Sequence, residues 1–151
     1  MDKAKSAELL MQLYDLRREP VMREARKWIG TYFPKSPEDF AQTMMDPEVG
    51  GYLRMVISYW DMAASFVRNG AIDAKMFDDA NGEHLFVYCK VRPHLAGLRA
   101  MFDMPNYLEH LEQVILELPD GEERIAKMEG WMAESEEKAE GGDGESAAQA
   151  G

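Results

Sequence analysis

Apolar residues recur every three or four positions through the middle of the chain, which is the spacing of one face of a helix. This stripe lies between two helix signals. Asp46-Pro47 can cap and start a helix, and Asn69-Gly70 can end one in the left-handed conformation. The pattern therefore predicts a core-facing helix between these signals, with Ile57 and Trp60 in the core. The stripe consists of Val49, Tyr52, Leu53, Val56, Ile57, Trp60, Ala63, Ala64 and Val67.

Similar start and stop signals follow this helix. Asp73 can cap a short helix, and Asn81-Gly82 can end it. Glu83 then opens a long helix that reaches Phe102 and carries one apolar face. Pro93 lies inside that helix, and we expect a bend there because proline removes a backbone hydrogen bond.

Helical patterns also fill both ends of the chain. Segments 3–16 and 20–33 form either two helices or one helix kinked at Pro20, because proline is tolerated in a first turn. No β-branched run alternates as a strand would. Further helices are predicted from Ser36 to Met45, from Asp103 to Leu118, and after the turn Pro119-Asp120-Gly121.

These elements predict an all-α protein. We expect a single-domain antiparallel helical bundle of about five to six helices over residues 1–133. From about Ser135 the composition changes to Glu, Gly, Ala, Ser and Gln. Such a segment has too few apolar groups to offset the entropy of ordering, so residues 134–151 are predicted to be a disordered acidic Gly/Ala/Glu tail.

The net charge of -11 is distributed in alternating blocks. Residues 1–35 hold eight Lys/Arg against five acids, and residues 84–102 hold three against none, so each block is +3. Three blocks are acidic. The net charge is -6 for residues 36–83 (three Lys/Arg against nine acids), -6 for residues 103–133 (two against eight) and -5 for residues 134–151 (one against six). Complementary surfaces on neighbouring helices explain such blocks most simply. The overall acidity argues against general nucleic-acid binding, which depends on Lys and Arg.

The basic segment 84–102 has two interpretations. Lys90, Arg92, His94 and Arg99 can complement a helix dipole and pair with acidic neighbours. Alternatively, they bind an acidic protein partner or the chain's own acidic tail. Arg92 and Arg99 lie seven residues apart, so in a continuous helix they would point the same way. We treat these four residues as candidate partner-binding residues.

No pattern predicts a catalytic residue, a cofactor or a metal. The positions three before the histidines are Asn81, Val91 and Tyr107, so the Glu-x-x-His motif of di-iron helices is missing. The single cysteine, Cys89, is expected to be a buried and inert packing residue. With one cysteine and no apolar run long enough for a membrane span, we expect a cytoplasmic protein.

Twelve methionines are many for 151 residues. They either fill gaps in the core or form an adaptable binding surface. The polar stripe opposite the core stripe is predicted to be a solvated face, and it holds Arg54, Ser58, Asp61, Ser65 and Arg68. The methionines considered for a binding surface are Met44, Met45, Met55, Met62, Met101 and Met104.

Several of these signals together resemble a known family. The run Ser58-Tyr59-Trp60-Asp61-Met62 leads to Val67-Arg68-Asn69-Gly70-Ala71-Ile72-Asp73, then to Met76-Phe77, Asn81-Gly82 and a helix with Pro93 and Arg99. Over roughly residues 8–118 this is similar to a bacterial all-helical family, domain of unknown function 4760. The resemblance implies a helical fold and no established activity. Many members resemble membrane-tethered proteins with an N-terminal span, which this sequence lacks.

The most consistent function is a non-enzymatic helical protein–protein interaction or regulatory module of a bacterial cytoplasmic protein. The alternative is an enzyme or enzyme subunit whose site is assembled between helices from scattered His, Arg and Asp residues. A deep cleft with convergent acids, His and Arg would favour the enzyme, and a shallow charged face would favour the module. The sequence leaves a homo-oligomer open.

Overall fold

Every element in the described part of the chain is helical. The computed structural model describes residues 2–149, with side chains to residue 141, and no strand occurs in that range. This confirms the all-α class. The helices are α1 (Lys3–Arg17), α2 (Pro20–Ile29), α3 (Pro37–Met44), α4 (Gly50–Arg68), α5 (Ala74–Ala80), α6 (Glu83–Val91), α7 (Leu95–Met101), α8 (Glu109–Leu116) and α9 (Gly121–Gln149), with the 3-10 turn η1 (Arg92–His94) between α6 and α7.

The α-helices of the described residues are more numerous than the expected five to six, and two of the breaks between them lie at prolines. Pro20 is the first residue of α2, and the Glu19 carboxylate accepts a hydrogen bond from the Met22 amide at 2.8 Å. The N-terminal segment is therefore two helices. Pro93 lies in η1, where the predicted long helix breaks into α6 and α7.

The predicted helix start at Asp103 is wrong, and α8 begins at Glu109. Asp103 and Leu108 have φ angles of 52° and 57°, in the left-handed region, which no regular helix can include. Residues 103–108 therefore form a loop. Asp46 likewise caps a turn ahead of α4 rather than the helix itself, since its carboxylate accepts from the amides of Glu48 and Val49 at 2.8 and 3.0 Å.

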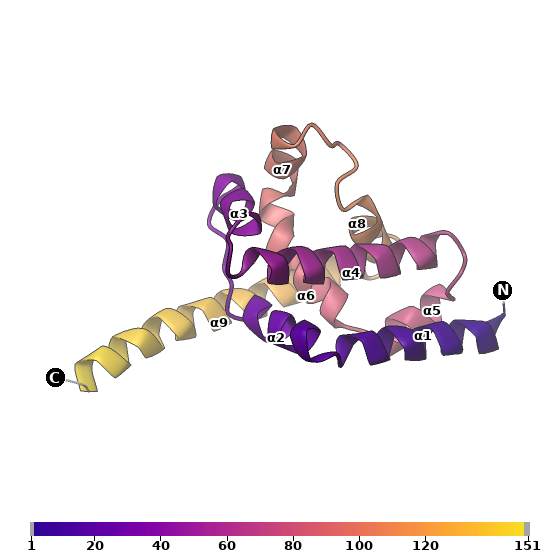
Figure 1. Cartoon of the computed structure of the whole chain (residues 1–151), viewed down its shortest axis with the longest axis horizontal. Coiled ribbons are helices and arrows are strands. Elements are labelled where there is room, and N and C mark those ends of the chain that lie inside the picture. The colour runs from indigo at the N-terminus through magenta and orange to yellow at the C-terminus, as the bar shows by residue number, and fades with distance from the viewer. Residues whose placement is uncertain (1, 150–151) are drawn as a thin grey trace.

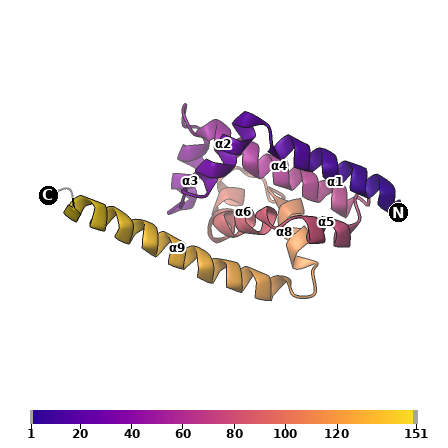
Figure 2. The same ribbon diagram turned by 90° about the horizontal axis from the view of Figure 1, so that it is seen from below.

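Helix α4 lies at the centre of the core. Its predicted stripe is buried from Leu53 to Val67, and Ile57 and Trp60 are 3% and 0% exposed, as expected. Figure 1 and Figure 2 show α1 and α2 running along α4 in the opposite direction, while α6 and α8 pack against other sides of it. None of the helices described is long and apolar enough to cross a membrane.

Helix α9 crosses the body and projects beyond it (Figure 1, Figure 2). Its first turns are anchored by the buried Ile125, and further along Lys35 forms an ion pair with Glu136. The backbone is helical through Gln149, and the disordered acidic tail expected for residues 134–151 stays a prediction. The side chains of 142–151 and the last two residues lie outside the described part, so the domain boundary at residue 134 stays a prediction.

Candidate functional site

Lys90, the first of the four predicted partner-binding residues, is buried rather than presented to a partner. Only 4% of it is exposed. Its ammonium donates a hydrogen bond to the Tyr32 carbonyl and lies 3.8 Å from the centroid of the Phe33 ring. Burial lowers the pKa of Lys90 to about 8, because the charged form loses its water.

The other three predicted residues contact three different parts of the chain. Arg92 is exposed and forms an ion pair with Glu129 of α9 at 2.6 Å. The ring Nε2 of His94 lies 3.1 Å from the Pro34 carbonyl oxygen. Arg99 donates to the Tyr107 carbonyl at 2.9 Å and to Glu112 of α8 at 3.1 Å. The break at Pro93 places Arg92 and Arg99 in different helical segments, so they do not lie on one continuous helix as expected. The role of the four residues in partner binding stays a prediction.

A second candidate is the buried polar cluster beneath the start of α6. Glu83 accepts from Arg26 at 2.8 Å and from the Trp60 indole at 3.2 Å. His84 is 3% exposed, and its Nδ1 has no hydrogen-bond partner among the described residues. Burial lowers the pKa of His84 to about 4, aided by the positive charges of Arg124 and Arg17 and opposed by Asp78 and Glu83.

This polar cluster is closed to a substrate. The cavity beside His84, lined also by Asp78, Asn81 and Arg124, has a volume of about 30 Å³. That volume accommodates about one water molecule. The alternative enzyme interpretation needed a deep cleft with convergent His, Arg and Asp, and this cavity is too small to be one.

The single cysteine, Cys89, is also buried, with 2% of it exposed. Burial raises the pKa of the Cys89 thiol to about 12, so the nucleophilic thiolate is scarce at neutral pH. Among the described residues, no three His, Cys, Asp or Glu side chains gather where they could hold a metal ion.

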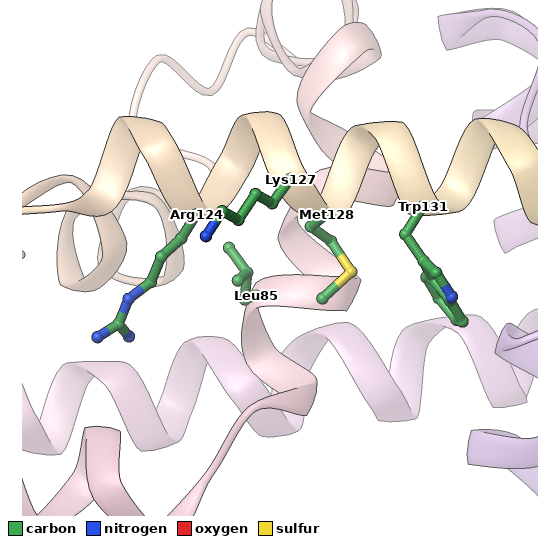
Figure 3. Close-up of a pocket in the computed structure, with 5 residues that line it drawn as sticks. All are labelled: Leu85, Arg124, Lys127, Met128 and Trp131. Carbon is green, nitrogen blue, oxygen red and sulfur yellow. The ribbon is translucent and has the colours of Figure 1, made fainter.

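A shallow hollow of about 400 Å³ lies between α6 and α9 (Figure 3). Arg124 and Lys127 line it beside Leu85, Met128 and Trp131, which is 56% exposed. The Arg124 guanidinium forms ion pairs with Asp78 at 2.6 Å and with Asp120 at 2.9 Å, so its charge is already neutralised. This hollow therefore offers mainly apolar contact.

A larger hollow runs along α4, and methionines are prominent in its lining. It encloses about 630 Å³ between α4, the end of α3 and the loop 103–108, and we call it the methionine groove. Met62 and Met104 on its walls are 40% and 51% exposed. Its lining includes Met44, Met55, Met62, Met104, Tyr107 and Leu108.

Local backbone geometry builds this groove. A Cβ atom on Gly50 would lie 2.5 Å from the Met44 carbonyl oxygen, so only glycine lets the end of α3 approach the start of α4 this closely. On the opposite wall Leu108 is 6% exposed in its left-handed conformation. Such a conformation costs about 1–2 kcal/mol for a residue other than glycine. Backbone strain of this kind tends to occur at functional sites.

The polar stripe of α4 forms part of the groove instead of a fully solvated face. Asp61 is half-buried, and its carboxylate accepts a hydrogen bond at 3.0 Å from the Leu111 amide in the first turn of α8. The stripe therefore holds α8 in place. No local sequence signal predicts this contact, because 50 residues separate the two positions.

The chain segments that border the methionine groove carry several acids, and we call these segments its rim. Asp46, Glu48 and Asp103 are exposed and lie within three residues of a lining position in sequence. Glu109 directly follows Leu108 and is half-buried, and Asp61 lines the groove itself. Arg54 is the basic residue in the lining, and its guanidinium donates to the Met44 carbonyl. The groove therefore combines apolar walls with a negative rim.

Comparison with known proteins identifies a family without adding an activity. The family model of a domain of unknown function (DUF4760) matches residues 4–118. The match runs from α1 through α8 and includes the methionine groove, but it excludes α9. No curated protein and no solved structure matches the chain.

Proposed function

The chain belongs to the DUF4760 family, and we propose that it is a non-enzymatic helical module that binds a partner protein in the methionine groove. The observation that supports this most strongly is the groove itself, about 630 Å³ of apolar hollow with exposed methionines. Methionine side chains are unbranched and polarisable, so they adapt to the shape of a bound segment. Met-rich surfaces of this kind favour protein recognition over the tight positioning that catalysis requires.

The surroundings of the groove support the same proposal. Met45 and Met101, next to the groove walls in sequence, are 78% and 48% exposed. Met62 and Met104 in the groove are likewise exposed, so four methionine side chains leave apolar surface in water. Burying apolar surface is favourable by about 25 cal/mol per Å², so a partner that covers these side chains gains free energy.

The reactive groups favour binding over catalysis. His84 faces a cavity of about 30 Å³, and Cys89 is kept as a thiol by burial. We include a cytoplasmic location in the proposal. It is supported by the single cysteine, since one cysteine cannot form a disulfide within the chain.

Site-specific photo-crosslinking in the native host tests this proposal. A photoreactive amino acid replaces Met62 or Met104 in the groove, and Met11 on α1, 66% exposed, serves as the matched control. We expect one discrete protein adduct from both groove positions and no such adduct from position 11. The proposal is contradicted if the groove positions give no protein adduct, or if position 11 gives the same one.

A further inference from the structure

The walls and rim of the methionine groove point to the chemistry of its occupant. We propose that the groove receives a basic amphipathic helix of the partner, with apolar side chains on one face and Lys or Arg on its flanks. This inference rests on the proposed function and adds the class of partner to it. It depends on three features of the groove: its length, its side chains and its charge.

The length of the groove matches a short helix. Its α4 wall extends from Gly51 to Met62 along one face of the helix. At 1.5 Å per residue this wall is about 16 Å long, which is about three helical turns. A partner helix lying along it would place anchors at positions i, i+4 and i+7 into the groove.

The side chains suit apolar anchors rather than polar ones. Met55, Met62 and Met104 line opposite walls with flexible thioethers. Of the polar side chains that line the groove, Asp61 is bonded to the Leu111 amide, Arg54 to the Met44 carbonyl and Ser58 to the Met55 carbonyl, which leaves Asn106 to pair with a ligand. A polar strand would leave its own backbone groups unpaired against methionine, whereas a helix satisfies them internally.

The charge of the rim selects a basic partner. Asp46, Glu48 and Asp103 are exposed on it, and the only lining cation in the described residues, Arg54, is already bonded. Lys or Arg flanking the apolar face of a partner helix would meet these carboxylates. An acidic helix, a phosphate group or a nucleic acid would be repelled by them.

Defined synthetic peptides test this proposal. The probes are an amphipathic Leu/Lys peptide about 18 residues or five turns long, a scrambled peptide of the same composition, and an amphipathic Leu/Glu peptide. The full chain carries ¹³C-labelled methionine methyl groups, observed by NMR. We expect the Leu/Lys peptide to shift the methyl signals of Met55, Met62 and Met104, while that of Met11 stays in place. The scrambled and Leu/Glu peptides should leave all four unchanged.

A rim variant isolates the contribution of charge. Glu48→Gln/Asp103→Asn removes two exposed acids and keeps a side chain that tolerates the left-handed conformation at position 103. It should weaken binding of the Leu/Lys peptide severalfold and flatten its salt dependence. The control Asp15→Asn/Glu24→Gln removes two exposed acids from α1 and α2 and should bind as the unchanged protein does.

Three results would overturn the inference. Equal shifts with the Leu/Glu peptide would show a groove that accepts helices regardless of charge, and the proposed function would stand. Equal shifts with the scrambled peptide would show adhesion by charge alone. Absence of shifts with every peptide would exclude this class of partner, and photo-crosslinking from Met62 would then decide separately whether the groove binds any protein.

Discussion

Leu108 shows how a single residue shapes the candidate site. Its φ angle of 57° is unfavourable for a branched side chain, yet its side chain is 94% buried in the wall of the methionine groove. Packing therefore holds the strained backbone in place, and the strained backbone sets where α8 begins. By contrast, Gly70 has a φ angle of 82° and needs no such support, because glycine adopts it freely.

Alanine substitutions at two glycines should have opposite effects on stability. Neither Gly70 nor Gly130 has a neighbouring atom within 4 Å of an added Cβ, so a steric clash plays no part. Gly70→Ala should lower the free energy of unfolding by about 1–2 kcal/mol because its φ is positive. Gly130→Ala, in α9, should raise it by about 0.5–1 kcal/mol through helix propensity. Urea denaturation measures the free energy of unfolding of both variants. Equal changes in the two would contradict the left-handed conformation of Gly70 and the helical conformation of Gly130.

The stability of the protein should depend on His84 between about pH 6.5 and pH 4. Burial lowers the pKa of His84 to about 4, so in this window the unfolded chain binds a proton that the folded chain does not. The contribution of His84 to the free energy of unfolding is therefore fully present above about pH 6.5, the pKa of histidine in the unfolded chain. It is lost as the pH falls to about 4, the pKa of His84 in the folded protein, and the total loss is roughly 3 kcal/mol. His84→Phe keeps an aromatic ring beside Phe77 and Trp60 and should lose less stability over the same window. Identical pH profiles of the two proteins by thermal melting would contradict this.

At the scale of elements, α8 depends on a side chain from α4. The Asp61 carboxylate accepts from the Leu111 amide near the positive end of α8, where a negative charge is also favourable. The residue in the N-cap position of α8, Leu108, has no side chain that could accept this bond. A contact between distant residues therefore replaces the local cap.

Asp61→Ala should destabilise the protein by about 0.5–2 kcal/mol, the usual cost of losing an N-cap acceptor. Asp61→Asn keeps an acceptor oxygen and should cost less. Ser58 is exposed and lies one turn earlier on the same polar stripe, so Ser58→Ala should change the free energy of unfolding by less than about 0.5 kcal/mol. Chemical denaturation of the three variants tests this. Equal effects of Asp61→Ala and Ser58→Ala would show that Asp61 does not hold α8.

Local signals predicted the elements that depend on local physics. Ser36 and Asp73 cap α3 and α5 as expected, and Gly70 ends the α4 region in the left-handed conformation. The start of α8 could not be predicted, because Asp103-x-Pro105 looks like a helix start and the true acceptor is Asp61. For the groove, the sequence indicated only which methionines could form a binding surface. It could not indicate which of them lie together, because that depends on the path of the loop 103–108.

At the scale of the whole molecule, the alternating charge blocks pair with one another. Arg26 of α2 binds Glu83 of α6, and Arg99 of α7 binds Glu112 of α8, at 2.8 and 3.1 Å. Arg92 similarly binds Glu129 of α9. These contacts agree with complementary surfaces on neighbouring helices. The acids left exposed include those on the rim of the groove and those along the outer part of α9.

Removal of residues 135–151 should leave the folded body intact. Within the described part of this segment, Ser135 and Glu136 are half-buried, and the ion pair with the body is the exposed one between Lys35 and Glu136, with Glu140 at 3.9 Å. Exposed ion pairs contribute about 0–1 kcal/mol. A chain truncated after Glu134 should therefore melt within a few degrees of the full chain. A fall of many degrees would show that this end of α9 packs on the body.

The central claim is that a partner protein covers the methionine groove, and methionine oxidation tests it most directly on the unmodified chain. Dilute peroxide converts exposed methionine to its sulfoxide, and mass spectrometry gives the rate at each position. Met62 and Met104 are 40% and 51% exposed, and Met11, outside the groove, is 66% exposed. In native host extract, relative to purified protein, we expect oxidation of Met62 and Met104 to slow while that of Met11 is unchanged. Equal rates for all three in extract and in purified protein would contradict the claim.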